Sequence, residues 1–179
     1  IGRYITLLER EFDIEFTYRV QTEPGGIAHA LRLAEDFIND TVAVILGDNI
    51  VQGDLSESFE TFEDSDTSAR IFLKQVSDPA RYGIAELDDD SVTDLVEKPD
   101  DPDSKKAVIG LYLYDSSVFE KIRQSTRSDR GELEITDVNY LYLQENELDH
   151  ELIDGDWFDV GTPEGLYEAT SRIREEKLE

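Results

Sequence analysis

The chain has 179 residues, of which 43 are acidic and 17 basic, giving a formal net charge of −26, and 39% of its residues are apolar. This apolar supply argues against intrinsic disorder, and the absence of any run of 18 apolar residues excludes a membrane-spanning helix. The negative charge repels phosphate backbones and anionic lipid, so we expect neither nucleic acid nor a membrane as a partner. Cysteine is absent, which excludes disulfides and thiolate chemistry. Nothing at the start resembles a signal peptide, and we expect a cytoplasmic location.

The acidic surplus has an unusual composition. Asp and Glu number 22 and 21, whereas only 6 of the 17 basic residues are Lys. This pattern is typical of a halophilic proteome, in which molar salt screens the self-repulsion of the chain. The alternative is an ordinary acidic cytosolic protein.

Salt dependence distinguishes these two interpretations. A halophilic chain with a net charge of −26 is stabilised when its like charges are screened, so we expect the melting temperature to rise from dilute buffer to molar KCl. Scanning calorimetry across that range measures the effect. A melting temperature that falls or stays flat would contradict the halophilic interpretation.

The N-terminal part of the chain carries three local patterns. Apolar residues at helical spacing predict a helix over residues 2–11, and strict alternation then predicts a strand over residues 14–20. The turn Pro24-Gly25-Gly26 breaks the alternation. An apolar stripe predicts a second helix over residues 27–38.

The rest of the chain alternates strands and helices. A continuous apolar run over residues 42–46, ended by Gly47, is typical of a strand buried on both faces. The later elements predicted are a helix over 55–62, strands over 69–76, 84–87, 92–97 and 108–114, helices over 117–123 and 133–145, a strand over 148–153 and a helix from Pro163 to about residue 177. This order predicts one α/β domain over residues 1–179, with a mixed, mainly parallel central sheet and helices on both faces.

Two aspartates follow predicted strands. Asp48 comes after Gly47 at the end of the 42–46 strand, and Asp159 lies in Trp157-Phe158-Asp159. Ligands gather at the carboxyl ends of strands in open α/β sheets, and two carboxylates there could hold Mg²⁺, which prefers oxygen ligands. The alternatives are that Asp48 or Asn49 caps a turn and that the second motif is a packed Trp followed by a turn.

Three further segments carry side chains suited to a sugar, a phosphate or a pyrimidine base. Glu97-Lys98-Pro99 closes a strand, where Glu can accept sugar hydroxyls and Lys can neutralise phosphate. The alternative is an exposed, charged strand end. Adjacent side chains of a strand point to opposite faces, so we do not expect Glu97 and Lys98 to form an ion pair. Arg130 precedes an acidic helix start and could grip phosphate, although a capping arrangement is the alternative. Gln21 leads into a Gly-rich turn and suits a pyrimidine edge.

The order of these motifs resembles that of the sugar-phosphate nucleotidyltransferase family. The resemblance runs from about residue 11 to residue 169 and depends on Gln21…Pro24-x-Gly26, Leu46-Gly47-Asp48-Asn49, Asp78-Pro79…Arg81-Tyr82-Gly83, Glu97-Lys98-Pro99, the Arg-Gly-Glu-Leu-Glu-Ile-Thr-Asp segment at 130–137, and Trp157-x-Asp159-x-Gly161-Thr162. It implies a Rossmann-like fold and assigns a role to each site residue. The metal ligands would be Asp48 and Asp159; the nucleotide site would comprise Gln21, Pro24, Gly26, Leu46 and Asp48; the sugar-phosphate site would comprise Tyr82, Gly83, Glu97, Lys98, Val108 and Arg130; and the catalytic set would be Asp48, Lys98, Arg130 and Asp159.

The resemblance also implies a reaction. A phosphate oxygen of a sugar 1-phosphate attacks the α-phosphorus of dTTP in line. Glucose 1-phosphate is the favoured sugar phosphate, and UTP is the alternative nucleotide. The products are a dTDP-sugar and pyrophosphate, and Mg²⁺ is the implied cofactor. Positioning and charge neutralisation supply most of the rate in such a transfer.

One part of the family pattern does not occur in this chain. Family members open with a strand and a Gly-rich loop that wraps the triphosphate, and neither is found here. We therefore expect the first strand to be missing, the 179-residue chain alone to have little turnover, and a parent with the loop to be active. The alternatives are a non-catalytic nucleotide-sugar binding module or an inactive fragment. The open sheet edge left by that strand leads us to expect a homo-oligomer.

Overall fold

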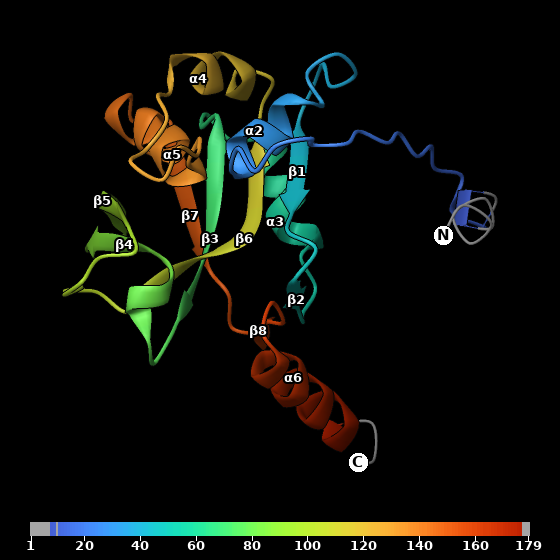
Figure 1. Cartoon of the computed structure of the whole chain (residues 1–179), viewed down its shortest axis with the longest axis vertical. Helices are drawn as coiled ribbons and strands as arrows, with labels where there is room; N and C mark the ends of the chain where they lie inside the picture. The colour runs from blue at the N-terminus through green and yellow to red at the C-terminus, as the bar shows by residue number, and fades with distance from the viewer. Residues whose placement is uncertain (1–7, 10, 177–179) are drawn as a thin grey trace.

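The computed structural model describes residues 8, 9 and 11–176, and its centre is a six-stranded sheet (Figure 1). The strand order is β5-β4-β6-β3-β7, and β1 pairs with β6 as well. The strands are β1 (Val42–Ile45), β3 (Ala69–Gln75), β4 (Gly83–Asp88), β5 (Ser91–Glu97), β6 (Lys106–Tyr114) and β7 (Leu148–Leu152).

The prediction of a mainly parallel sheet is wrong. Among the described strands only β3 and β7 pair in parallel, whereas β6 is antiparallel to each of its partners β1, β3 and β4. The strands β4, β5 and β6 follow one another with no helix between them, and β4 and β5 form a hairpin that pairs Asp88 with Ser91. Hairpin connections impose antiparallel pairing, while parallel pairing needs a crossover connection.

Helices cover both faces of the sheet, as predicted. On one face, α2 (Ile27–Arg32), α4 (Val118–Gln124) and α5 (Ile135–Gln144) pack against inward side chains that include Tyr112 and Tyr114 of β6. On the other face, α3 (Ser56–Glu63) packs through Phe62 against Leu111 and Leu113. This alternation along β6 follows the two-residue period of a strand. None of the described helices is long and apolar enough to span a membrane.

A small second sheet lies beside the main one (Figure 1). It pairs β2 (Asn49–Val51) antiparallel with β8 (Trp157–Asp159), and α6 (Pro163–Glu176) follows β8 directly. The sequence patterns predicted no strand over residues 49–51, because three residues are too few to show a period. This sheet joins two distant parts of the chain next to the end of β1.

The N-terminal predictions are only partly tested. Most of the helix predicted over residues 2–11 lies outside the described residues, although residues 8, 9, 11 and 12 are helical. The strand predicted over residues 14–20 is wrong, since this segment has no regular structure and Val20 is 79% exposed. Alternation predicts an apolar face, but a strand also needs a partner, and in the described part of the chain no strand pairs with this segment, which runs away from the sheet (Figure 1).

Two further elements differ from expectation. The helix predicted over residues 27–38 ends at Arg32, and residues 33–37 continue as turns. The strand predicted to be buried on both faces is β1, which pairs only with β6 among the described strands and leaves Ile45 60% exposed. An apolar run therefore marked a strand correctly but did not reveal its position at the edge.

The turn before α2 requires glycine at position 26. Gly26 has φ +88°, and a Cβ there would collide with the carbonyl oxygen of Leu133, which accepts a hydrogen bond from Ala28 N at 3.3 Å. Leu133 N in turn donates to Gly25 O at 2.8 Å. The turn therefore locks onto the segment that precedes α5.

We expect Gly26→Ala to destabilise the protein by at least about 2 kcal/mol, because it adds a steric clash to a left-handed backbone. The control is Gly131→Ala, where φ is +78° but a Cβ would meet no atom within 4 Å. Gly131→Ala should lower the free energy of unfolding by about 1 kcal/mol, which is the cost of the left-handed backbone alone. Urea denaturation measures both, and equal losses would contradict the clash.

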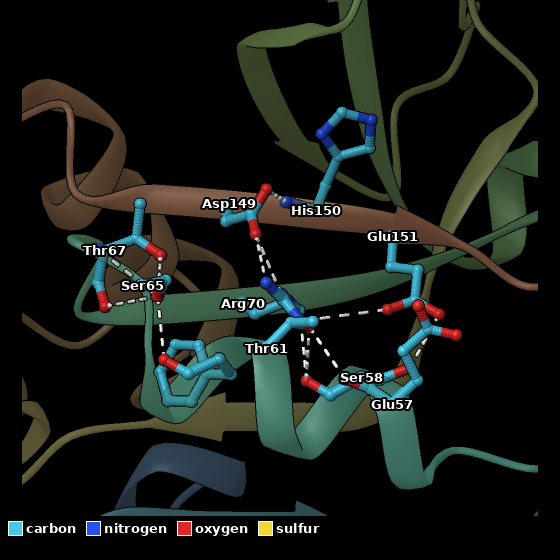
Figure 2. Close-up of polar contacts among 10 residues, drawn as sticks. Glu57, Ser58, Thr61, Ser65, Thr67, Arg70, Asp149, His150 and Glu151 are labelled. Atoms are coloured by element: carbon cyan, nitrogen blue, oxygen red, sulfur yellow. Dashed lines mark hydrogen bonds and ion pairs between the residues drawn. The ribbon is translucent and has the colours of Figure 1, made fainter.

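A buried arginine attaches α3 to the sheet (Figure 2). Arg70 of β3 donates to Asp149 Oδ2 of β7 at 2.8 Å, to Ser58 O of α3 at 2.6 Å and to Thr61 Oγ1 at 2.9 Å. Glu151 lies on the same face of β7, with an oxygen 3.9 Å from the guanidinium. One side chain thus ties one helix and two strands together.

Candidate functional site

A cavity of about 190 Å³ opens where the end of β1 meets β6, β8 and the start of β4. It collects eight of the residues predicted for the site, namely Leu46, Asp48, Tyr82, Gly83, Glu97, Lys98, Val108 and Asp159. The remaining predicted residues, Gln21, Pro24, Gly26 and Arg130, do not line it.

The small sheet brings the two predicted metal ligands together. Asn49 pairs with Asp159 in the β2–β8 register, and Val160 N donates to Asp48 O at 2.8 Å. A Cβ built on Gly161 would lie 3.1 Å from Asp48 Oδ2 and 3.1 Å from Asp159 Oδ1. The two carboxylates therefore flank one gap that exists because residue 161 has no side chain.

Asn49 holds the carboxylate of Asp48 in place. Its Oδ1 accepts hydrogen bonds from Trp157 Nε1 at 2.7 Å and Gly110 N at 3.0 Å. These two donors fix the orientation of the amide, so that Nδ2 is left to donate to Asp48 Oδ1 at 3.0 Å. Asn49 is thus a positioning residue rather than a turn cap.

The gap between the carboxylates fits a Mg²⁺ ion by its donor chemistry. Both groups that face it, Asp48 Oδ2 and Asp159 Oδ1, are hard oxygen ligands. Within residues 8, 9 and 11–176, no group of three or more His, Asp or Glu side chains could hold a metal. Two carboxylates are the usual protein share of a site that Mg²⁺ completes with water and substrate phosphate.

Asp159 also contacts two side chains on its other oxygen. Oδ2 lies 3.3 Å from the Arg81 guanidinium and accepts from Tyr82 OH at 3.4 Å. Partial burial raises the pKa of Tyr82, with the Asp159 charge adding to the rise and Arg81 opposing it. The Tyr82 ring packs edge-on against Trp157 at 5.3 Å between centroids. The phenol therefore stays a neutral donor at the wall of the cavity.

The expectation that Glu97 and Lys98 form no ion pair is wrong. Lys98 lies just past β5 with φ +45°, and this left-handed backbone turns its Nζ to 3.7 Å from Glu97 Oε1. Lys98 N donates to Tyr82 O at 3.1 Å. Such a conformation is costly for a residue with a side chain and gathers at functional sites.

The Glu97 carboxylate is held from three sides. Thr136 Oγ1 donates to Oε2 at 2.6 Å, while Arg130 and Lys98 lie near Oε1, the former at 3.2 Å. A Cβ on Gly83 would come within 3.2 Å of Glu97 Oε2 and 3.1 Å of Thr136 Oγ1. The bare backbone of Gly83 therefore keeps open the space in front of the carboxylate.

Arg130 stands behind Glu97 rather than in the cavity wall. Its guanidinium pairs with Glu134 at 2.9 Å, with Glu97 at 3.2 Å and more distantly with Glu132 at 4.0 Å. The hydrogen bond to Glu134, together with the neighbouring carboxylates, raises the pKa of Arg130. The guanidinium is thus a permanent cation whose nearest partners are the protein's own carboxylates.

Three residues predicted for the nucleotide site, Gln21, Pro24 and Gly26, lie in or just before the Gly-rich turn. Gln21 Nε2 contacts Gly26 O at 3.0 Å and His29 Nδ1 at 3.0 Å. Both contacts use the amide nitrogen. Ile27, directly after Gly26, does line the cavity.

Several residues at the site were not singled out by the sequence patterns. Asn49, Trp157, Thr136 and Arg81 gain their place through contacts with residues far along the chain, such as the bond between Asn49 and Trp157. All four stand inside the motifs at 46–49, 78–83, 130–137 and 157–162. Their position inside these motifs was the signal that could have identified these four residues. Their hydrogen-bond partners could not be predicted from the spacing of the motifs.

The Nucleotidyl transferase family matches residues 4–176 of this chain. A protein from Haloferax volcanii named low-salt glycan biosynthesis nucleotidyltransferase Agl11 is 42% identical over 170 residues, which cover 93% of this chain and 48% of that protein. A glucose-1-phosphate thymidylyltransferase from Mycolicibacterium smegmatis is 41% identical over 169 residues, 92% of this chain and 58% of that protein. The chain thus spans between 48% and 58% of the length of these curated relatives.

Solved structures share the fold. A Bacillus anthracis protein assigned as a glucose-1-phosphate thymidylyltransferase, crystallised with a sucrose, superposes with a TM-score of 0.88 at 44% identity, covering 97% of this chain and 72% of that one. UDP-glucose pyrophosphorylase complexed with UDP-glucose superposes with a TM-score of 0.80 at 25% identity, covering 90% of this chain and 66% of that one. With the family match over residues 4–176, these likenesses show that the chain belongs to the nucleotidyl transferase family.

Proposed function

We propose that this site transfers a thymidylyl group from dTTP to glucose 1-phosphate. The observation that carries the proposal is the convergence of Asp48 and Asp159 on one gap at Gly161, in the same cavity as Glu97 and Lys98. A two-carboxylate cation site beside a cationic side chain suits a reaction that joins two phosphates. In this reaction a phosphate oxygen of glucose 1-phosphate bonds to the α-phosphorus, and the bond to the β-phosphate breaks to release pyrophosphate.

The chain's own residues divide the work of binding and orientation. Asp48 and Asp159 would hold Mg²⁺, which when bound neutralises charge on the phosphate oxygens. Lys98 holds the phosphate of the attacking sugar phosphate by charge, and Arg130 supports it from behind Glu97. Glu97, fixed by Thr136, accepts hydrogen bonds from sugar hydroxyls. Little covalent chemistry is asked of these groups, since positioning and charge neutralisation carry the rate.

The named relatives favour dTTP over UTP as the nucleotide. Relatives about 40% identical are named glucose-1-phosphate thymidylyltransferases, and UDP-glucose pyrophosphorylase shares the fold at 25% identity. Gln21 and Gly26 would meet the base, and Pro24 and Leu46 would belong to the rest of the nucleotide site. We therefore place dTTP first and UTP as its competitor.

Two measurements in parallel test the proposal. Pyrophosphate release from dTTP, glucose 1-phosphate and Mg²⁺ reports turnover, and calorimetric titration with dTDP-glucose reports the product site without requiring turnover. We expect dTDP-glucose to bind more tightly than UDP-glucose at the same KCl concentration. We expect little release from this chain and release from a form that also carries the Gly-rich triphosphate loop. Binding without release by both forms would support a nucleotide-sugar binding module. A chain that binds neither nucleotide sugar and releases no pyrophosphate would overturn the proposal.

A further inference from the structure

Arg81 is a charged side chain at the site to which the proposed reaction assigns no task. It ends the short 3₁₀ helix η1 (Pro79–Arg81), and its side chain is 47% exposed. The guanidinium carbon rests 5.3 Å from the centre of the Tyr82 ring, and one nitrogen lies 3.3 Å from Asp159 Oδ2. A fixed backbone thus carries a side chain that has room to move.

Arg81 stands between two cavities. The cavity of about 190 Å³ that holds the site and a neighbouring one of about 330 Å³ share part of their walls. The side chains common to both are Arg81, Tyr82, Trp157 and Asp159. A guanidinium at this boundary can turn toward either space without leaving the Tyr82 ring.

The pair between Arg81 and Asp159 is weak by its geometry. A single nitrogen meets a single oxygen at 3.3 Å, which is long for a charge-assisted hydrogen bond, and nearly half of the Arg81 side chain is exposed. Exposed ion pairs of this kind contribute little to stability. The guanidinium can therefore be displaced by a stronger competitor.

The proposed cation site supplies that competitor. Asp159 turns Oδ1 toward the gap that it shares with Asp48, and Oδ2 toward Arg81. A divalent ion in the gap and the guanidinium would then lie on the two oxygens of one carboxylate, where they repel each other. Binding of either cation to Asp159 weakens the binding of the other.

We propose that Arg81 is an exchangeable counter-ion of this site. It holds Asp159 while no divalent cation is bound, and it turns to a phosphate of the bound nucleotide sugar or nucleotide once a cation takes the gap. The proposal rests on the proposed function, because it takes Asp48 and Asp159 as the cation ligands. Arg81 therefore has opposite effects on the two ligands. It weakens the binding of the cation and strengthens the binding of the phosphate.

The test measures two affinities on the same variants. Mn²⁺ serves as the probe of the cation gap and is followed by electron paramagnetic resonance, while dTDP-glucose is titrated calorimetrically with Mn²⁺ saturating. We expect Arg81→Gln to bind Mn²⁺ roughly three- to tenfold more tightly. The same variant should bind dTDP-glucose roughly three- to tenfold more weakly. Arg81→Lys keeps the charge and should restore both affinities toward those of the unaltered chain.

The matched control is Arg123→Gln. Arg123 of α4 is 48% exposed and pairs with Glu35, so the substitution removes the same charge at the same exposure but at a distance from the cavity. We expect it to change neither affinity more than about twofold. A general effect of net charge would shift the two arginine variants equally and would overturn the proposal.

A third variant separates this proposal from the function on which it rests. Asp48→Asn should lose Mn²⁺ binding. If Asp48→Asn binds Mn²⁺ like the unaltered chain, the cation site fails and the role of Arg81 fails with it. If Asp48→Asn loses Mn²⁺ while Arg81→Gln changes neither affinity, or changes both in the same direction, only the counter-ion proposal is overturned.

Discussion

Replacing Asp48 by Asn is expected to weaken Mn²⁺ or Mg²⁺ binding by roughly a hundredfold or more, because one of two charged ligands becomes neutral. The shape of the side chain is kept, and the hydrogen bond to Asn49 and the backbone contact with Val160 can persist. Any thymidylyl transfer should fall at least as steeply. Titration of the cation and the pyrophosphate assay measure the two effects.

The loss of cation binding in Asp48→Asn should not come with a loss of stability. Without a cation, Asp48 and Asp159 both face one gap and repel each other. Asp48→Asn removes that repulsion, so the melting temperature without divalent cation should stay level or rise. A variant that loses binding because it unfolds would instead melt earlier, and this outcome would contradict a role confined to the site. Asp101→Asn, at an exposed loop position, removes the same charge elsewhere and controls for net charge.

Gly161→Ala tests the geometry of the site with both charges retained. Its methyl group would lie 3.1 Å from an oxygen of each carboxylate and would fill the gap. Both neighbours are ends of side chains that can shift, so the fold should tolerate the change. We expect cation affinity to fall by about tenfold or more, since the ligands are pushed apart. Unchanged affinity would show that the cation does not bind between Asp48 and Asp159.

Local sequence patterns predicted some elements of the fold and some residues of the site. The strands that became β3 and β6 and the helix that became α5 were predicted because each is long enough to display its period. Asp48, Asp159, Glu97 and Lys98 were predicted for the site because they stand at strand ends, where ligands gather. The order of all the motifs along the chain carried the family resemblance, which assigned the roles of the site residues. These inferences use only the order of residues along the chain.

What the sequence could not supply is pairing between distant segments. The direction of β6 depends on its partners β1 and β3, which no local pattern records. The β2–β8 sheet has three residues in each strand, yet it decides that Asp48 and Asp159 meet. Lys98 similarly departs from strand geometry by one backbone angle, φ +45°. The sequence predicted that Lys98 and Glu97 point to opposite faces, but with this angle they form an ion pair.

Replacing Arg70 by Met is expected to lower the free energy of unfolding by about 3 kcal/mol, the scale of breaking a buried ion pair from one side. The Arg70 side chain is only 8% exposed, and it holds Asp149, Ser58 O and Thr61 together (Figure 2). Met fills much of the same space but donates no hydrogen bond. For a chain of 179 residues the loss corresponds to a melting temperature lower by roughly 6–12 °C.

The charges left behind determine the size of this loss. Asp149 and Glu151 lie on the same face of β7 and would no longer share a cation. Both carboxylates are about one third exposed, so water recovers part of the cost, and molar KCl should recover more by screening. The loss should therefore be larger in dilute buffer than in high salt.

A double-substitution cycle isolates the pair. Asp149→Asn removes one of the stranded charges, so Arg70→Met combined with Asp149→Asn should cost less than the sum of the two single changes, by about 1 kcal/mol or more. Arg123→Met controls for net charge, because Arg123 is half exposed in its pair with Glu35, and should cost no more than about 1 kcal/mol. Additive effects in the cycle would show that Arg70 does not stabilise the chain through Asp149. Equal losses from the two arginines would show that the buried position of Arg70 adds nothing to its contribution.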